Sequence, residues 1–150
     1  MAAIYEYTFR RRKVAEPLGT VRSPADVVAL LCEYVRPDAA ETEHLVLAVL
    51  DTKNAVIGVE ELYRGNLAGS SVRVCEVFRT AVRLNAAAIV LAHNHPSGDP
   101  TPSSDDIAVS AEIERAGRIL DIALLDHVVL GNDGRTASLR ALGHVGGGIA

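Results

Sequence analysis

The sequence lacks the features that mark several classes of protein. It has only two cysteines in 150 residues, Cys32 and Cys75, and they form no CxxC pair. We expect both to be small buried hydrophobic residues in a reducing compartment rather than disulfide partners or metal ligands. The N-terminus has no signal-peptide core, and no run approaches the roughly 18 apolar residues of a membrane span. The sequence therefore predicts a soluble, cytoplasmic protein without a membrane partner.

An excess of positive charge is also missing. The chain has 15 Lys and Arg residues against 19 Asp and Glu residues, for a net charge of −4. Proteins that bind nucleic acid through a general electrostatic surface normally carry a basic excess. One short basic run, Arg10–Lys13, has no aromatic platform beside it, and we interpret it as a solvated strand end or loop. We therefore expect no tight direct binding of nucleic acid.

What the chain does contain is a series of helical and strand patterns, with 49% hydrophobic residues. Ser23-Pro24 predicts a helix start and Arg36-Pro37-Asp38 its end. Two more helices are predicted, one carrying the apolar residues of 74–84 and the other at Ser103–Leu120. Strands are predicted at Leu45–Leu50, Ala55–Arg64, Ala86–Ala92, Ile122–Leu130 and Arg135–Leu139. This order predicts a single α/β domain over residues 1–150, a mixed β-sheet flanked by helices.

The starts and faces of the later helices follow from local chemistry. Ser70 or Ser71 is expected to cap the middle helix, and Ser103 to cap the third. The first turn of the third helix contains Asp105 and Asp106, which favour the positive end of the helix dipole. Its buried face is predicted from the apolar residues Ile107, Val109, Ala111, Ile113, Ala116 and Ile119.

The most informative segment is Leu91–Asp106, which reads LAHNHPSGDPTPSSDD. His93 and His95 end an apolar strand, and residues at i and i+2 point to the same face with Cα atoms roughly 6.5 Å apart. Both imidazoles can therefore reach one metal ion, and a carboxylate from the next helix would make a third ligand. Three protein ligands with an open fourth position are typical of catalytic zinc. The helix dipole explains why an acid follows, but not whether Asp105 or Asp106 faces the metal.

This motif resembles the signature of the RadC family, a bacterial branch of the JAMM/MPN metalloprotease superfamily. The resemblance lies in HNHPSGDPTPSSDD and in three flanking stretches that agree in order and spacing: EHLVLAVLDTKNAVIGVEELYRGNL, FRTAVRLNAAAIVLAHNHPSGDPTPS and LLDHVVLGNDGRTASL. It covers about residues 23–139 and implies a cytidine deaminase-like α/β sandwich of the JAMM/MPN type. RadC-type chains usually carry an N-terminal helix-hairpin-helix-like region, which we expect to be absent because the chain is too short to hold it.

The resemblance also implies roles for individual residues. His93, His95 and Asp106 correspond to the zinc ligands, and Ser103 to a residue beside the metal that helps to stabilise an oxyanion. Glu43 takes the place of the family's glutamate at the start of the first hairpin strand. It is the expected general base, which takes a proton from a zinc-activated water and passes it to the leaving amine.

Other polar residues near the motif have competing interpretations. Glu60 and Glu61 on the return strand are the alternatives to Glu43 as general base. Asn94 alternates to the opposite strand face from the two histidines, so we expect it to form hydrogen bonds rather than to bind metal. The pair Asp126-His127 is expected to organise the sheet, and support of the metal site is the less favoured alternative.

The resemblance implies a zinc-dependent metallohydrolase that cleaves an amide or isopeptide bond of a protein or peptide substrate. Two alternatives stay open: a RadC-type DNA repair or DNA-processing factor or nuclease, and a metal-bearing interaction module without turnover. His93-Asn94-His95 is not an HNH nuclease motif, because the residues of that motif are spread over a ββα-metal unit. A zinc nucleobase deaminase is disfavoured, because its His-x-Glu and Pro-Cys-x-x-Cys elements are missing. DNA-repair partners and a homo-oligomer also stay open.

Overall fold

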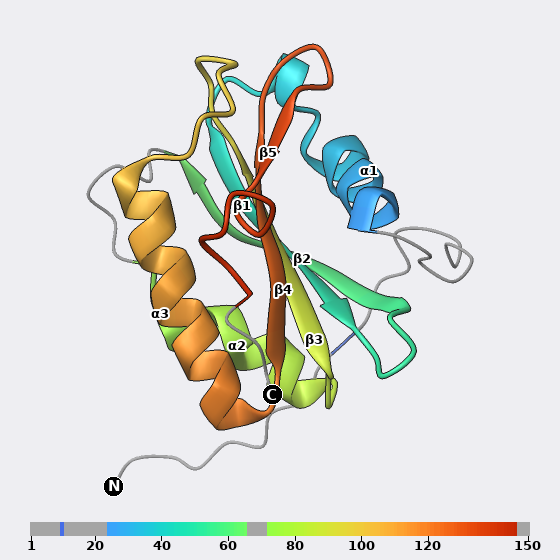
Figure 1. Ribbon diagram of the computed structural model, residues 1–150. Coiled ribbons are helices and arrows are strands. Elements are labelled where there is room, and N and C mark those ends of the chain that lie inside the picture. The colour runs from blue at the N-terminus through green and yellow to red at the C-terminus, as the bar shows by residue number, and fades with distance from the viewer. Residues whose placement is uncertain (1–9, 11–23, 66–71, 147–150) are drawn as a thin grey trace, which may run out of the picture.

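The computed structural model describes residue 10 and residues 24–65 and 72–146. Its five strands form one mixed sheet in the order β2-β1-β3-β4-β5. The strands are β1 Glu43–Leu50, β2 Val56–Gly65, β3 Ala88–Asn94, β4 Ala123–Leu130 and β5 Thr136–Ser138. The helices are α1 Pro24–Val35, the short 3-10 helix η1 Pro37–Ala39, α2 Val74–Arg83 and α3 Ser104–Leu120 (Figure 1). The predicted α/β fold with a mixed sheet is confirmed.

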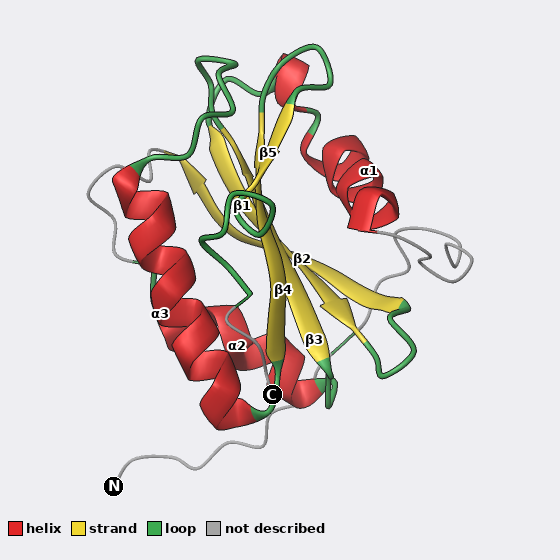
Figure 2. Cartoon of the chain, viewed as in Figure 1, coloured by secondary structure: helices red, strands yellow, loops and turns green. Residues whose placement is uncertain are grey.

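The sheet lies between two layers of helix. Figure 2 shows α1 on one side of the strands and α2 with α3 on the other. We call these two sides of the sheet the α1 face and the α3 face. Alternate residues of β1 enter two separate apolar cores, so that Leu45 packs on the α3 face and Val46 on the α1 face. Because both faces are covered, β1 and β3 appear in the sequence as continuous apolar runs rather than alternating ones.

The topology brings three chain segments to one end of the sheet. Strands β3 and β4 pair in parallel, so the chain must cross over between them, and α3 makes this crossover. Helix α3 therefore starts near the end of β3. Strand β1 runs antiparallel to β3, with Leu45 paired to His93, so that β1 begins where β3 ends. The end of a parallel strand and the start of the helix that follows it are a common position for sites in α/β proteins.

Most predicted elements agree with the structure to within a few residues, and the differences at their ends have local causes. Strand β1 begins at Glu43 rather than Leu45, because Glu43 pairs with Gly65 of β2. Helix α2 begins at Val74 with Arg73 in the N-cap position and no side-chain cap bond, so the prediction of a serine cap was wrong. The predicted caps Ser23, Ser70 and Ser71, and the basic residues 11–13, lie outside the described residues.

The predicted buried face of α3 was partly wrong. Ile113 is buried as expected, but Ile119 is 80% exposed. The positions that face the sheet include the small residues Ser110 and Gly117, which are both buried. A Cβ atom at Gly117 would lie 2.3 Å from the carbonyl oxygen of Ile122, so only glycine allows the chain to approach the helix this closely. Ser110 and Gly117 are seven residues apart, about two helical turns, so they lie on the same side of α3.

Two predictions from composition can also be compared with the structure. Cys75 is exposed and Cys32 is half-buried, so the expectation that both are buried was wrong. Neither forms a disulfide; both are free cysteines. Within the described ranges, the helices lack the length and hydropathy that a bilayer-crossing segment needs.

Candidate metal centre

The two histidines of the motif meet at the end of β3. His93 is the sixth residue of the strand and only 1% exposed, whereas His95 follows the strand and is half-buried. Their Nε2 atoms lie 3.0 Å apart. The strand alternation that predicted a shared face for these two side chains is therefore confirmed.

A tight loop fixes the ring of His95. Its Nδ1 lies 2.8 Å from the backbone carbonyl oxygen of Asp99. A carbonyl can only accept, so Nδ1 carries the hydrogen and Nε2 of the neutral ring presents a lone pair. Thr101 holds Asp99 in place through its backbone N–H and its hydroxyl, which both donate to Oδ1 of Asp99. Gly98 makes the turn possible, with a φ of 78° and Asn132 too close for a Cβ atom.

The start of α3 aims one carboxylate at these rings. Ser103 is the N-cap, as predicted, and its Oγ accepts the N–H of Asp106 while Oδ2 of Asp106 accepts the N–H of Ser103. This capping box holds Asp106 with Oδ1 at 3.1 Å from Nε2 of His93 and Oδ2 at 3.4 Å from Nε2 of His95. Its neighbour Asp105 is exposed. Of the two acids at the helix start, Asp106 is thus the one beside the histidines.

The surroundings keep Asp106 ionised. Burial raises the pKa of the carboxyl group, but a hydrogen bond and the charge of His93, together with the bonds from Ser103, lower it by more. The net effect places the pKa of Asp106 well below its usual range. The group is therefore a carboxylate, which is the form that binds cations.

Glu43 is the only one of the three candidate general bases that lies at this cluster. Its Oε1 is 3.9 Å from Nε2 of His93, and the ligand atoms of Glu43, His93 and His95 all lie within 4.8 Å of one another. Glu61 instead bonds to Arg64 and is 3.3 Å from His44, whose side chain is on the α1 face. Glu60 points to Arg79, at 3.5 Å.

The distances suit a metal ion held by four ligands. For tetrahedral zinc, with bonds of about 2.0–2.2 Å, neighbouring ligand atoms should lie about 3.3 Å apart. The Nε2 atoms of His93 and His95 are 3.0 Å apart, and the Asp106 carboxylate lies 3.1 Å from the first and 3.4 Å from the second. The 3.9 Å from Glu43 to His93 is longer. Two imidazoles and carboxylate groups thus form a potential metal site in this structure.

His127 lies beside His93, in line with the less favoured interpretation of this residue, and Ser110, which was not predicted, contacts His127. Nδ1 of His93 lies 2.8 Å from Nε2 of His127 on β4, and Nδ1 of His127 lies 2.6 Å from Oγ of Ser110 on α3. Burial, and next the charge of His93, lower the pKa of His127 to about 3. Asp126 does organise the sheet as predicted, because it accepts bonds from Ser138 and from the backbone N–H of Arg140. The sequence feature that could have identified Ser110 is its position one helical turn after Asp106, which puts both residues on the same side of the helix.

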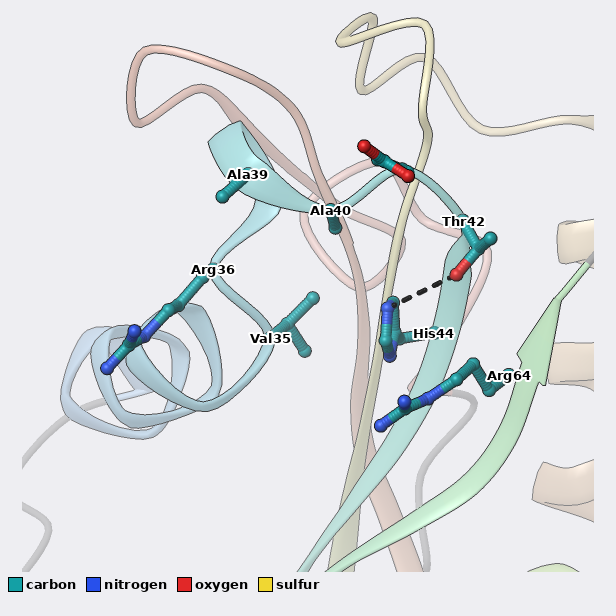
Figure 3. A pocket seen from close by; sticks show the side chains of 8 residues that line it. Val35, Arg36, Ala39, Ala40, Thr42, His44 and Arg64 are labelled. Atoms are coloured by element: carbon teal, nitrogen blue, oxygen red, sulfur yellow. Dashed lines mark hydrogen bonds between the residues drawn. The ribbon is translucent and has the colours of Figure 1, made fainter.

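A second polar group lies at the same end of the sheet, on the α1 face. Here the side-chain amide of Asn94 accepts the N–H of His44 and donates to the carbonyl of Thr42, which confirms its predicted role. This group borders an open hollow with a volume of about 530 Å³. Figure 3 shows His44 and Arg64 among the side chains that line it. The hollow is lined by Val35, Arg36, Ala39, Ala40, Glu41, Thr42, His44 and Arg64.

Comparison with known proteins places the chain in a family. Residues 21–144 match the family model of the RadC-like JAB domain. A UPF0758 protein of Chloroflexus aurantiacus (strain J-10-fl) is 48% identical over 132 residues, which are 88% of this chain and 56% of the relative. The UPF0758 protein of Roseiflexus castenholzii is 48% identical over 123 residues, which are 82% of this chain and 52% of the relative.

A third relative, the UPF0758 protein of Methanococcoides burtonii, is 44% identical over 130 residues, which are 87% of this chain and 56% of the relative. The chain thus spans a little over half the length of these relatives. The matched region contains every residue of the metal cluster. Since the family model covers most of the sequence, the chain belongs to the family of RadC-like JAB domains.

Proposed function

We propose that this domain is a zinc-dependent metallohydrolase that cleaves an amide or isopeptide bond in a protein or peptide substrate. The observation that carries the proposal is the arrangement of His93, His95 and Asp106, whose nitrogen and oxygen atoms lie 3.0–3.4 Å apart. These three residues would hold the ion. When bound, zinc lowers the pKa of a water molecule to about 7 and polarises a carbonyl group.

Glu43 is the residue that moves the proton. Its carboxylate is 3.9 Å from Nε2 of His93, farther than the Asp106 carboxylate, and its side chain is 17% exposed. It therefore reaches the space beside the three proposed ligands, and its ligand oxygen lies within 4.8 Å of those of His93 and His95. An ionised carboxylate at this position accepts a proton from water at Oε1 and then donates it to the departing amine nitrogen.

Ser103 is proposed to stabilise negative charge on the substrate. Its Oγ accepts the N–H of Asp106, which leaves the hydroxyl hydrogen for another acceptor. The capping box fixes this hydroxyl beside the Asp106 carboxylate. A fixed donor next to the reacting carbonyl lowers the barrier more than a mobile one, because it needs no reorganisation during the reaction.

The test is hydrolysis by the zinc-loaded protein, with quenched fluorescent peptides and an isopeptide-linked peptide pair as substrates. We expect turnover by the wild type and a fall of about 10²–10⁴-fold in Glu43→Gln, at unchanged zinc content. The matched control is Glu41→Gln, which neutralises an exposed acid two residues earlier and should retain full turnover.

Equal turnover in Glu43→Gln and wild type would contradict the assignment of the base. A wild type that binds zinc and cleaves none of these bonds would contradict the hydrolase proposal. The two alternatives would then be separated by adding DNA substrates: cleavage of DNA indicates a nuclease, and binding of partners without any cleavage indicates a metal-bearing interaction module.

A further inference from the structure

His93 has a second ring nitrogen, which points away from the metal cluster into the protein. This nitrogen, Nδ1, is 2.8 Å from Nε2 of His127, and Nδ1 of His127 is 2.6 Å from Oγ of Ser110. Oγ of Ser110 in turn lies 2.7 Å from the backbone carbonyl oxygen of Asp106. All three side chains are buried, with exposures of 0–2%. A continuous row of hydrogen bonds therefore links His93 on β3 to Asp106 on α3.

The backbone carbonyl of Asp106 determines which group donates in each of these hydrogen bonds. Each bond needs one hydrogen and one lone pair, and a carbonyl group has no hydrogen to give. Ser110 therefore donates its only hydroxyl hydrogen to Asp106, and its Oγ must accept a hydrogen from Nδ1 of His127. A neutral imidazole carries one N–H, so Nε2 of His127 is left with a lone pair and accepts from Nδ1 of His93.

The consequence appears at the other nitrogen of His93. With the hydrogen on Nδ1, a neutral His93 ring has its lone pair on Nε2, the nitrogen on the side of the metal cluster. If the row ran in the reverse direction, His127 would donate from Nε2 and the hydrogen of His93 would sit on its own Nε2. That hydrogen would block the binding of a metal ion.

We propose that His127 and Ser110 are positioning residues that hold His93 in the tautomer able to bind the metal. The inference rests on the proposed function, because it gives these hydrogen bonds a role in metal binding. Partners of this kind fix the ring orientation of a ligating histidine, and their loss typically weakens metal binding about 10–100-fold. Here the row also joins the two chain segments that supply His93 and Asp106.

The first test reads the hydrogen positions without any variant. The nitrogen-15 chemical shifts of the histidine rings are measured in metal-free and zinc-loaded protein at about pH 8, above the ordinary histidine pKa of about 6.5. We expect His127 to carry its hydrogen on Nδ1 in both forms. A hydrogen on Nε2 of His127 would overturn the proposal.

The second test measures zinc affinity by competition with a coloured chelator. His127→Leu removes the acceptor for His93, and Ser110→Ala removes the acceptor for His127, so both should bind zinc about 10–100-fold more weakly. His127→Gln retains an amide oxygen and an amide N–H, and should recover most of the affinity. The control, Ser104→Ala, removes an exposed hydroxyl from the same helix and should bind as the wild type does.

Unchanged zinc affinity in Ser110→Ala would overturn the proposal even if His127→Leu fails to fold. None of these measurements uses a substrate, so the inference and the proposed function fail separately. A protein with the expected His127 tautomer and weakened variants, but without hydrolysis, would contradict only the function. An active enzyme with the hydrogen on Nε2 of His127 would contradict only the inference.

Discussion

The two polar groups at the same end of the sheet differ in how their hydrogen bonds balance. On the α1 face, the Glu61 carboxylate accepts two bonds from Arg64 and lies 3.3 Å from His44, while Asn94 bonds both ways with the backbone of β1. Each acceptor there meets a donor. On the α3 face, Nε2 of His93, Nε2 of His95 and the Asp106 carboxylate converge, and His95 has already donated its hydrogen to Asp99.

This difference separates a structural network from a binding site. On the α1 face, guanidinium and amide N–H groups donate to carboxylate and carbonyl oxygens, and the group needs no ligand. On the α3 face, two imidazole nitrogens and a carboxylate converge at 3.0–3.4 Å, and a divalent metal is the ligand that this geometry suits.

Removal of the two imidazoles should abolish metal binding. We expect His93→Ala/His95→Ala to lose the zinc that the wild type holds at about one ion per chain, as elemental analysis of purified protein would show. The matched control, His44→Ala/His144→Ala, also removes two histidines and should retain the ion. Loss of zinc from the control, or its retention in the first variant, would place the site elsewhere.

Asp106→Asn should weaken zinc binding by more than the roughly 10–100-fold that the loss of a supporting group costs. The amide still accepts the N–H of Ser103, so the helix cap survives while the negative charge is lost. Asp105→Asn removes the same charge one residue earlier and should change the affinity little. Calorimetric titration with zinc compares the two, and similar affinities would refute the assignment of Asp106.

Ser103 should show two separable effects. Ser103→Ala removes the N-cap, which should cost about 1 kcal/mol of unfolding free energy, and it should also slow turnover more than it weakens substrate binding. Ser103→Asn restores the cap but not the hydroxyl. We therefore expect the unfolding temperature of Ser103→Asn to recover towards that of wild type while kcat remains low. Recovery of both would show that Ser103 acts only as a helix cap.

The smallest effect is expected on the α1 face. Hydrogen bonds from Arg64 lower the pKa of Glu61, so this group stabilises the folded state above its unfolded pKa of about 4.3 and loses that contribution as pH falls through the folded value. Because Arg64 is 67% exposed, the contribution should be below about 1 kcal/mol. Below pH 4, the free energy of unfolding of Glu61→Gln, measured with urea, should fall slightly less steeply than that of wild type, and the zinc content should be unchanged. A large loss of zinc would contradict the contrast between the two faces.

The parts of the site that depend on local sequence could be predicted. His93 and His95 share a face because strands alternate, and Ser103 caps the helix that carries Asp106. The placement of Glu43 was not available from periodicity; it came from the family resemblance, since the antiparallel pairing of β1 with β3 joins residues far apart in the sequence, such as Leu45 and His93.

A supporting role for His127 was the less favoured interpretation, and Ser110 was not predicted, because the placement of both residues depends on packing. Apolar periodicity assigned the buried face of α3 to residues such as Ile119, whereas the buried positions are Ser110, Ile113 and Gly117. Apart from Asp126 and His127, the strand β4 is apolar, and only the register between β3 and β4 places His127 beside His93. A polar residue in an apolar pattern thus signals a partner that the pattern alone does not identify.

The most direct test of the central claim is zinc-edge anomalous diffraction from crystals of the wild-type protein grown with zinc. The account predicts one strong peak between Nε2 of His93, Nε2 of His95 and the carboxylate of Asp106, and none beside His44 and Glu61. A strong peak on the α1 face instead, or no peak at the histidine pair in zinc-saturated crystals, would contradict it.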